Sequence, residues 1–133
     1  HPNCLALDTH KLGEEDIKVI VNGKNQITEL SKTWSIEKAI GESIGIEKIS
    51  HAYLLALHEE LEHMILHEKL DNVFYELAFE RLIARGQYFY PVDTSAYFSM
   101  ELDTPEDFHD AINRIPKHLQ AWKLYYFANK NTQ

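Results

Sequence analysis

The chain has 133 residues, enough for one compact domain whose hydrophobic core needs no disulfide or metal ion to support it. A composition with 44% hydrophobic and 26% charged residues excludes global disorder. Thirteen Lys and Arg residues against 21 Asp and Glu residues give a formal net charge of -8. This charge disfavours direct binding to nucleic acids or anionic membranes and favours a basic protein partner.

The sequence lacks the features that mark secretion or a membrane anchor. Cys4 is the only cysteine, so no disulfide can form within the chain, and no Asn-x-Ser/Thr glycosylation site occurs. No apolar run approaches the roughly 20 residues of a membrane-spanning helix. We therefore expect a cytoplasmic protein without membrane contact, and the sequence contains no signature of an oligomeric state.

The first thirty residues predict an irregular segment followed by a β-hairpin. Residues 1–13 are expected to form an irregular N-terminal segment. Residues 17–30, "IKVIVNGKNQITEL", indicate two short strands around Asn22-Gly23, a dipeptide typical of tight hairpin turns. Because a two-stranded hairpin is only marginally stable alone, it must pack on helices or pair with later strands.

Apolar residues at helical spacing dominate the middle of the chain. Residues 33–45 predict a first helix, which ends at Gly45. Residues 46–70 continue the helical pattern without Gly or Pro, and residues 71–86 resume it. Because Asp71 or Asn72 would cap a new helix well, two helices with a bend near residue 71 are favoured over one long rod.

The last third of the chain mixes both patterns. Residues 87–102 are aromatic-rich and alternating, which predicts a second strand pair. Thr104 as N-cap and Pro105 at the first helical position predict a helix over residues 104–115, and residues 116–130 predict a last one.

These elements together predict one compact α+β domain over residues 1–133. Helices predominate in it, with about four to five of them. The β-structure is an N-terminal hairpin around residues 17–30 and a second short strand pair around residues 87–102.

The stretch "HEELEHMILHEKL", residues 58–70, combines three histidines and four glutamates with apolar residues. On a helical wheel of about 100° per residue, His58 and Glu62 lie beside the apolar arcs, whereas Glu60 and its polar neighbours lie on the side that faces away from the main arc. Residues four apart can bond each other or share one ion. We favour a His58–Glu62 pair inside a helix–helix seam over a ligand role.

A divalent-metal site is the competing interpretation of this stretch. Its ligands would be His58, Glu62, His63 and His67, with His109 or His118 brought near by folding, and its ion would be zinc or iron. The zinc-protease pattern HExxH fails because position 62 is Glu. Glu60-x-x-His63 and Glu106-x-x-His109 match the short pattern of di-iron bundles, but a chain rich in Glu and His contains such pairs by chance. We expect no cofactor, and zinc or iron only under this alternative.

Aromatic and acidic side chains around the second strand pair indicate a protein-binding surface. Its members are Tyr88, Tyr90, Asp93, Tyr97, Glu101 and Asp103. The sequence holds no phosphate-binding glycine loop and no nucleophile motif, so an enzyme is not favoured. We expect a small acidic, non-enzymatic protein that binds a basic partner and inhibits it, as immunity proteins and antitoxins do. The alternative is a helical protein, possibly an enzyme, that binds zinc or iron through the helix over residues 51–68.

Overall fold

The computed structural model describes residues 1–10, 12–13, 16–33, 36–102 and 104–120. The chain divides into two compact units, residues 1–96 and 97–133, and each is described by itself. The single domain expected over the whole chain stays a prediction.

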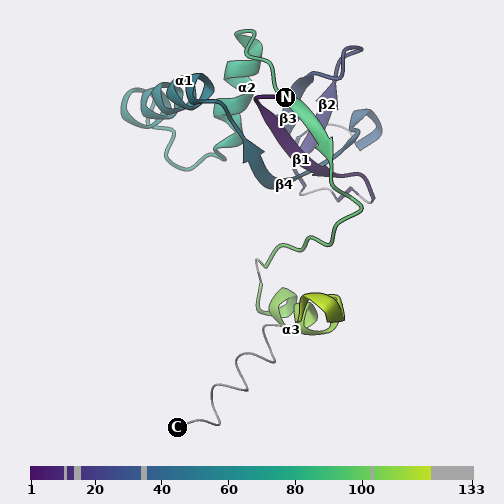
Figure 1. The fold of residues 1–133 in the computed structure, drawn as a ribbon. Coiled ribbons are helices and arrows are strands. Elements are labelled where there is room, and N and C mark those ends of the chain that lie inside the picture. Colours follow the sequence, from purple (N-terminus) through teal and green to yellow (C-terminus); the bar gives the residue numbers. More distant parts are fainter. Residues whose placement is uncertain (11, 14–15, 34–35, 103, 121–133) are drawn as a thin grey trace. The chain divides into compact units, whose positions relative to one another are not determined.

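The first unit contains a five-stranded mixed sheet (Figure 1). Its strands are β1 (Cys4–Asp8), β2 (Lys18–Val21), β3 (Ile27–Ser31), β4 (Gly41–Lys48) and β5 (Tyr90–Asp93). They lie in the order β3-β2-β4-β1-β5, in which β5 is parallel to β1 and all other neighbours are antiparallel. The irregular segment predicted over residues 1–13 is therefore wrong, because β1 pairs on both edges. Leu5 and Leu7 point into the core, as alternate residues of a strand do. Two alternating residues are too few to identify a strand from the sequence when the strands it pairs with are unknown.

The expected hairpin is present as β2 and β3, but its turn is longer than the two residues that Asn22-Gly23 suggested. The loop closes with a hydrogen bond from the Asn22 N–H to the Gln26 carbonyl, 2.9 Å long. Asn25 has a φ of 57°, so it supplies the left-handed residue of the turn. The Asn22 side chain accepts hydrogen bonds from two backbone N–H groups of the loop and holds it closed.

The helix predicted over residues 33–45 is wrong. The described part of this segment forms a short 3-10 turn, η1 (Ile36–Lys38), and then enters β4. A Cβ at Gly41 would lie 2.5 Å from the Asp8 carbonyl oxygen, so only glycine permits β4 to approach β1 there. Gly45 has a φ of +69° and lies where the register between β1 and β4 shifts. Both glycines therefore serve a strand, and sheet pairing overrides the helical spacing of the isoleucines.

Two helices complete the first unit. They are α1 (His51–Glu62), which continues as the π-helical turn η2 (His63–His67), and α2 (Glu76–Ala84). The Ser50 hydroxyl caps α1 by accepting the Tyr53 N–H at 3.3 Å, and Gly86 with a φ of +85° follows the end of α2. The two predicted helices separated near residue 71 are thus present, although the first is shorter because residues 46–48 belong to β4.

One core joins the sheet to both helices. Its members are Leu5, Leu7, Val19, Ile27, Leu30, Tyr53, Leu57, Met64, Ala78, Phe79, Leu82 and Phe89. In addition, α2 packs along the outermost strand β3, where the Glu80 carboxylate accepts the Leu30 N–H at 3.2 Å. This contact covers an otherwise open sheet edge and fixes α2 beside α1.

The second unit contains α3 (Pro105–Arg114) and the 3-10 turn η3 (Lys117–Leu119). The Thr104 hydroxyl accepts the Asp107 N–H at 3.1 Å, and the Asp107 carboxylate accepts the Thr104 N–H at 2.9 Å, which forms the reciprocal capping box. Residues 116–130 were predicted as a helix, and residues 121–130 lie outside the described part of the chain. None of the helices that the structure describes is long and apolar enough to cross a membrane.

The second strand pair predicted over residues 87–102 is also wrong. Only residues 90–93 form a strand there, and β5 pairs with β1. The described chain is an α+β protein with a five-stranded sheet and three α-helices, so the expectation that helices predominate is corrected as well.

Candidate functional site

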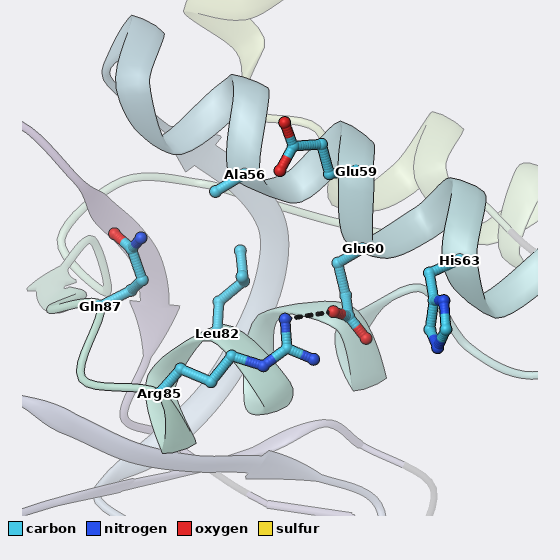
Figure 2. Close-up of a pocket in the computed structure, with 7 residues that line it drawn as sticks. All are labelled: Ala56, Glu59, Glu60, His63, Leu82, Arg85 and Gln87. Carbon is cyan, nitrogen blue, oxygen red and sulfur yellow. Dashed lines mark ion pairs between the residues drawn. The ribbon is translucent and has the colours of Figure 1, made fainter.

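A pocket of about 360 Å³ lies between α1 and the end of α2 (Figure 2). Its lining residues are Ala56, Glu59, Glu60, His63, Leu82, Arg85 and Gln87. All of them belong to the first unit: α1 supplies three, η2 and α2 supply one each, and Arg85 and Gln87 follow the end of α2. The volume lies near the small end of the range of about 300–1,000 Å³ for ligand pockets.

The carboxylate of Glu60 forms the charged floor of this pocket. Only 3% of Glu60 is exposed. Arg81 Nη1 donates to its Oε1 at 3.0 Å, and Arg85 Nη1 lies 2.6 Å from its Oε2. Figure 2 shows the Arg85 side chain reaching across the pocket to this carboxylate. Two guanidinium groups therefore satisfy the buried charge, as burial of a carboxylate requires.

The ion pairs continue from Arg81 to the π-helical turn. Arg81 makes a bidentate pair with Glu68, with both N···O distances at 2.8 Å, and Glu68 Oε1 lies 3.0 Å from His63 Nε2. Glu68 directly follows the π-helical turn, and its N–H donates to the His63 carbonyl at 3.2 Å. One connected set of charges thus ties α2 to both α1 and η2.

Two opposing effects set the pKa of Glu60. Burial acts to raise this pKa, but the hydrogen bonds and charges of Arg81 and Arg85 outweigh burial and leave it below its ordinary value. The same carboxylates, Glu68 first and Glu60 second, raise the pKa of the Arg81 guanidinium. Glu60 is therefore ionised at neutral pH, and Arg81 and Arg85 balance its charge.

The remaining lining groups favour a long basic side chain as ligand. Ala56 and Leu82 give the pocket an apolar wall, and Glu59 stands on α1 next to Glu60. Within the residues that the structure describes, Glu59 is exposed and its carboxylate makes no hydrogen bond or ion pair. An apolar wall beside an unpaired carboxylate suits the methylene stem and cationic head of lysine or arginine.

The four residues expected as metal ligands do not converge. His58 Nδ1 and Glu62 Oε2 are 3.7 Å apart on the solvent side of α1, where both side chains are exposed. His63 pairs with Glu68, and its ring centroid lies 5.4 Å from that of His67. In the described part of the chain, no three His, Cys, Asp or Glu side chains are grouped so that they could hold a metal ion. A zinc or iron site stays a prediction.

The expected partner-binding residues fall into three groups. Tyr88, Tyr90 and Asp93 belong to the first unit, where Tyr88 is exposed and Tyr90 stacks on His1 with ring centroids 3.8 Å apart. Tyr97 and Glu101 belong to the second unit, and Asp103 lies outside the described residues. A role of these residues in partner binding stays a prediction.

A second polar cluster lies at the carboxyl ends of the parallel strands β1 and β5. His10 Nδ1 is 2.6 Å from Asp8 Oδ1, and the Ser95 hydroxyl donates to Asp93 Oδ1 at 2.6 Å while accepting the Thr9 N–H at 2.8 Å. Hydrogen bonds lower the pKa of both aspartates. For Asp8 the main cause is the hydrogen bond from the His10 backbone N–H, and for Asp93 it is the hydrogen bond from the Ser95 hydroxyl. The polar groups bond to one another, and they close the ends of the two strands.

The helical wheel predicted the wrong polar residues of α1 to be buried. Glu60 was expected to face water, and His58 and Glu62 were expected in a seam, but Glu60 is buried whereas His58 and Glu62 are exposed. The buried side follows Tyr53, Leu57, Glu60 and Met64. One sequence signal does point to Glu60, namely the pair Arg81 and Arg85, four residues apart on one face of the following helix.

Comparison of the chain with protein-family profiles and with curated protein sequences finds no match. The geometry of the pocket is therefore the basis for assigning a function.

Proposed function

We propose that this chain is a non-enzymatic interaction protein that binds a basic segment of a partner protein and blocks the surface it covers. The observation that carries this proposal is the pocket between α1 and α2, where Glu59 stands unpaired among the described residues beside the buried carboxylate of Glu60. An arginine or lysine of the partner would lay its methylene stem against Ala56 and Leu82 and bring its charge to Glu59.

The position of Arg85 supports the same ligand class. Its side chain is 59% exposed, whereas the Arg81 side chain is 27% exposed and is bound by two carboxylates. Arg85 therefore pairs with one oxygen of Glu60 while most of its own side chain is open to solvent. An arginine from a partner can share or replace this contact without leaving the buried charge unpaired, since Arg81 remains in place.

The charge of the whole chain acts in the same direction. A formal net charge of -8 attracts a basic partner over a distance of about one Debye length and speeds the encounter. The long-range field sets the association rate, and the pocket sets which side chain is held.

Binding of a fluorescein-labelled octa-arginine peptide, followed by fluorescence anisotropy at low and physiological salt, tests the proposal. We expect Glu59→Gln to weaken binding about five- to tenfold, because it removes a charge-assisted contact in the pocket. Asp110→Asn is the matched control, since it removes the same charge from an exposed position on α3. Equal losses for both variants, or no binding by the wild type, would show that the pocket does not receive the peptide.

A further inference from the structure

The solvent side of α1 and of its continuation η2 carries an ordered set of side chains that the pocket does not use. Its members, called the outer stripe here, are Leu54, Leu55, His58, Glu62, Ile65 and Leu66. Between 48% and 57% of each of the four apolar members is exposed. Single exposed leucines are ordinary, but four apolar side chains on one side of a helical segment form a patch of the kind that marks an interaction surface.

The order of side chains in the outer stripe is symmetric about position 60. Leu54 and Leu66 lie six positions on either side of it, and Leu55 and Ile65 lie five positions on either side. His58 and Glu62 lie two positions on either side. Reversing the direction of the helix therefore exchanges apolar with apolar residues and His58 with Glu62.

This pattern is what a two-fold symmetric interface requires. In such an interface the same surface meets itself, and each contact occurs twice. With two copies of the α1–η2 segment antiparallel and centred on position 60, each Leu54 lies at the level of a Leu66, and each Leu55 at the level of an Ile65. Each His58 faces the Glu62 of the other copy, so the central charges are complementary.

We propose that two copies of this chain pair through the outer stripes of antiparallel α1 helices. The 3.7 Å distance between His58 and Glu62 within one chain is long for a hydrogen bond, and both side chains are more than half exposed, so both are available to the second copy. One helix face covers less than the roughly 800 Å² per partner of a standard interface, so we expect a weak pair whose formation depends on protein concentration.

Sedimentation velocity over about 5–500 μM protein at pH 6 tests the pairing. The wild type is expected to show a sedimentation coefficient that rises with concentration. His58→Glu places a glutamate opposite each Glu62, and Glu62→Lys places a lysine opposite each His58. Each single variant should therefore raise the dissociation constant at least tenfold.

A mixture of the two variants gives the sharpest result. In a mixed pair, the introduced glutamate faces the introduced lysine, and the native Glu62 faces the native His58, so an equimolar mixture should regain the association that each variant has lost. Neither variant keeps the pair within its own helix, so recovery cannot come from restored helix stability. His67→Glu, which makes the same charge change outside the stripe, should behave as the wild type.

A wild type that stays monomeric over the whole range would overturn the proposal. So would a mixture without recovery, or a His67→Glu variant that dissociates as His58→Glu does. Octa-arginine binding by His58→Glu should stay within twofold of the wild type, because the pocket lies on another side of α1. The test of pairing is therefore separate from the test of peptide binding.

Discussion

Glu60 and Glu62 lie two positions apart on α1 and have the same side chain, but they differ in burial and in the groups that they contact. Glu60 is 3% exposed and is held by Arg81 of α2 at 3.0 Å and by Arg85, which directly follows α2, at 2.6 Å. Glu62 is exposed, and its Oε2 lies 3.7 Å from His58 Nδ1. The side of α1 that meets α2 therefore carries fixed charges with structural partners, whereas the outer stripe carries charges that a second molecule can use.

The side of α1 that meets α2 and the solvent side should differ most in how much a glutamate contributes to the free energy of unfolding. Glu60→Ala should lower the free energy of unfolding by about 2–4 kcal/mol, because it leaves arginine charge without its buried partner. Urea denaturation followed by circular dichroism measures this change. A loss below about 0.5 kcal/mol, the size usual for exposed pairs, would mean that the pairs at Glu60 are no stronger than surface ones.

The contribution of the Glu60 ion pairs to stability should also appear as a dependence of the melting temperature on pH, with both arginines in place. The pKa of Glu60 in the folded chain is lower than its ordinary value of 4.5, so ionised Glu60 stabilises the fold above that pH. This stabilisation is lost as the pH falls through the lowered pKa. Melting temperatures from pH 6 to pH 3 should therefore fall more steeply for the wild type than for Glu60→Gln, which takes up no proton at this position. Parallel curves would contradict the lowered pKa.

Tyr53 offers the opposite case, a buried hydroxyl for which the described residues supply no hydrogen-bond acceptor. Its ring packs against Phe79 and Phe89, with centroid distances of 5.9 Å and 5.3 Å. Its hydroxyl is buried and has no hydrogen-bond partner among the described residues, and burial raises its pKa. Tyr53→Phe keeps the ring and should raise the free energy of unfolding by about 1 kcal/mol. Destabilisation in urea denaturation would show that the hydroxyl has a partner after all.

The smallest effect is expected on the solvent side of α1. Glu62→Ala should change the free energy of unfolding by less than about 0.5 kcal/mol, because an exposed pair four residues apart on a helix contributes little. Dilute protein, below about 5 μM, is needed so that self-association does not add to the measurement. A loss comparable to that of Glu60→Ala would remove the distinction between the two sides.

The sequence predicted correctly those elements whose capping or turn residues lie within a few positions of one another. Thr104 and Pro105 place the start of α3, and Gly86 places the end of α2. The alternation over residues 17–30 correctly indicates a hairpin. Each of these features depends on capping or turn chemistry that acts over one turn of chain.

Features that depend on distant partners could not be predicted in this way. β1 is a strand because β4 and β5 lie on either side of it, more than thirty residues further along the chain. Gly45 does adopt a positive φ, as its predicted role required, but in a strand irregularity instead of a helix end. Glu60 was placed on the side of the helix facing water because the wheel contains one helix, whereas its burial depends on Arg81 and Arg85 of the next.

The most direct test of the binding pocket is a titration of ¹⁵N-labelled protein with unlabelled octa-arginine, followed by amide chemical shifts. We expect the largest shift changes at the residues that line the pocket between α1 and α2, with Glu59 and Arg85 among them, and their loss in Glu59→Gln. Changes spread evenly over the acidic surface, or concentrated at Tyr88, Tyr90 and Asp93, would contradict binding in this pocket.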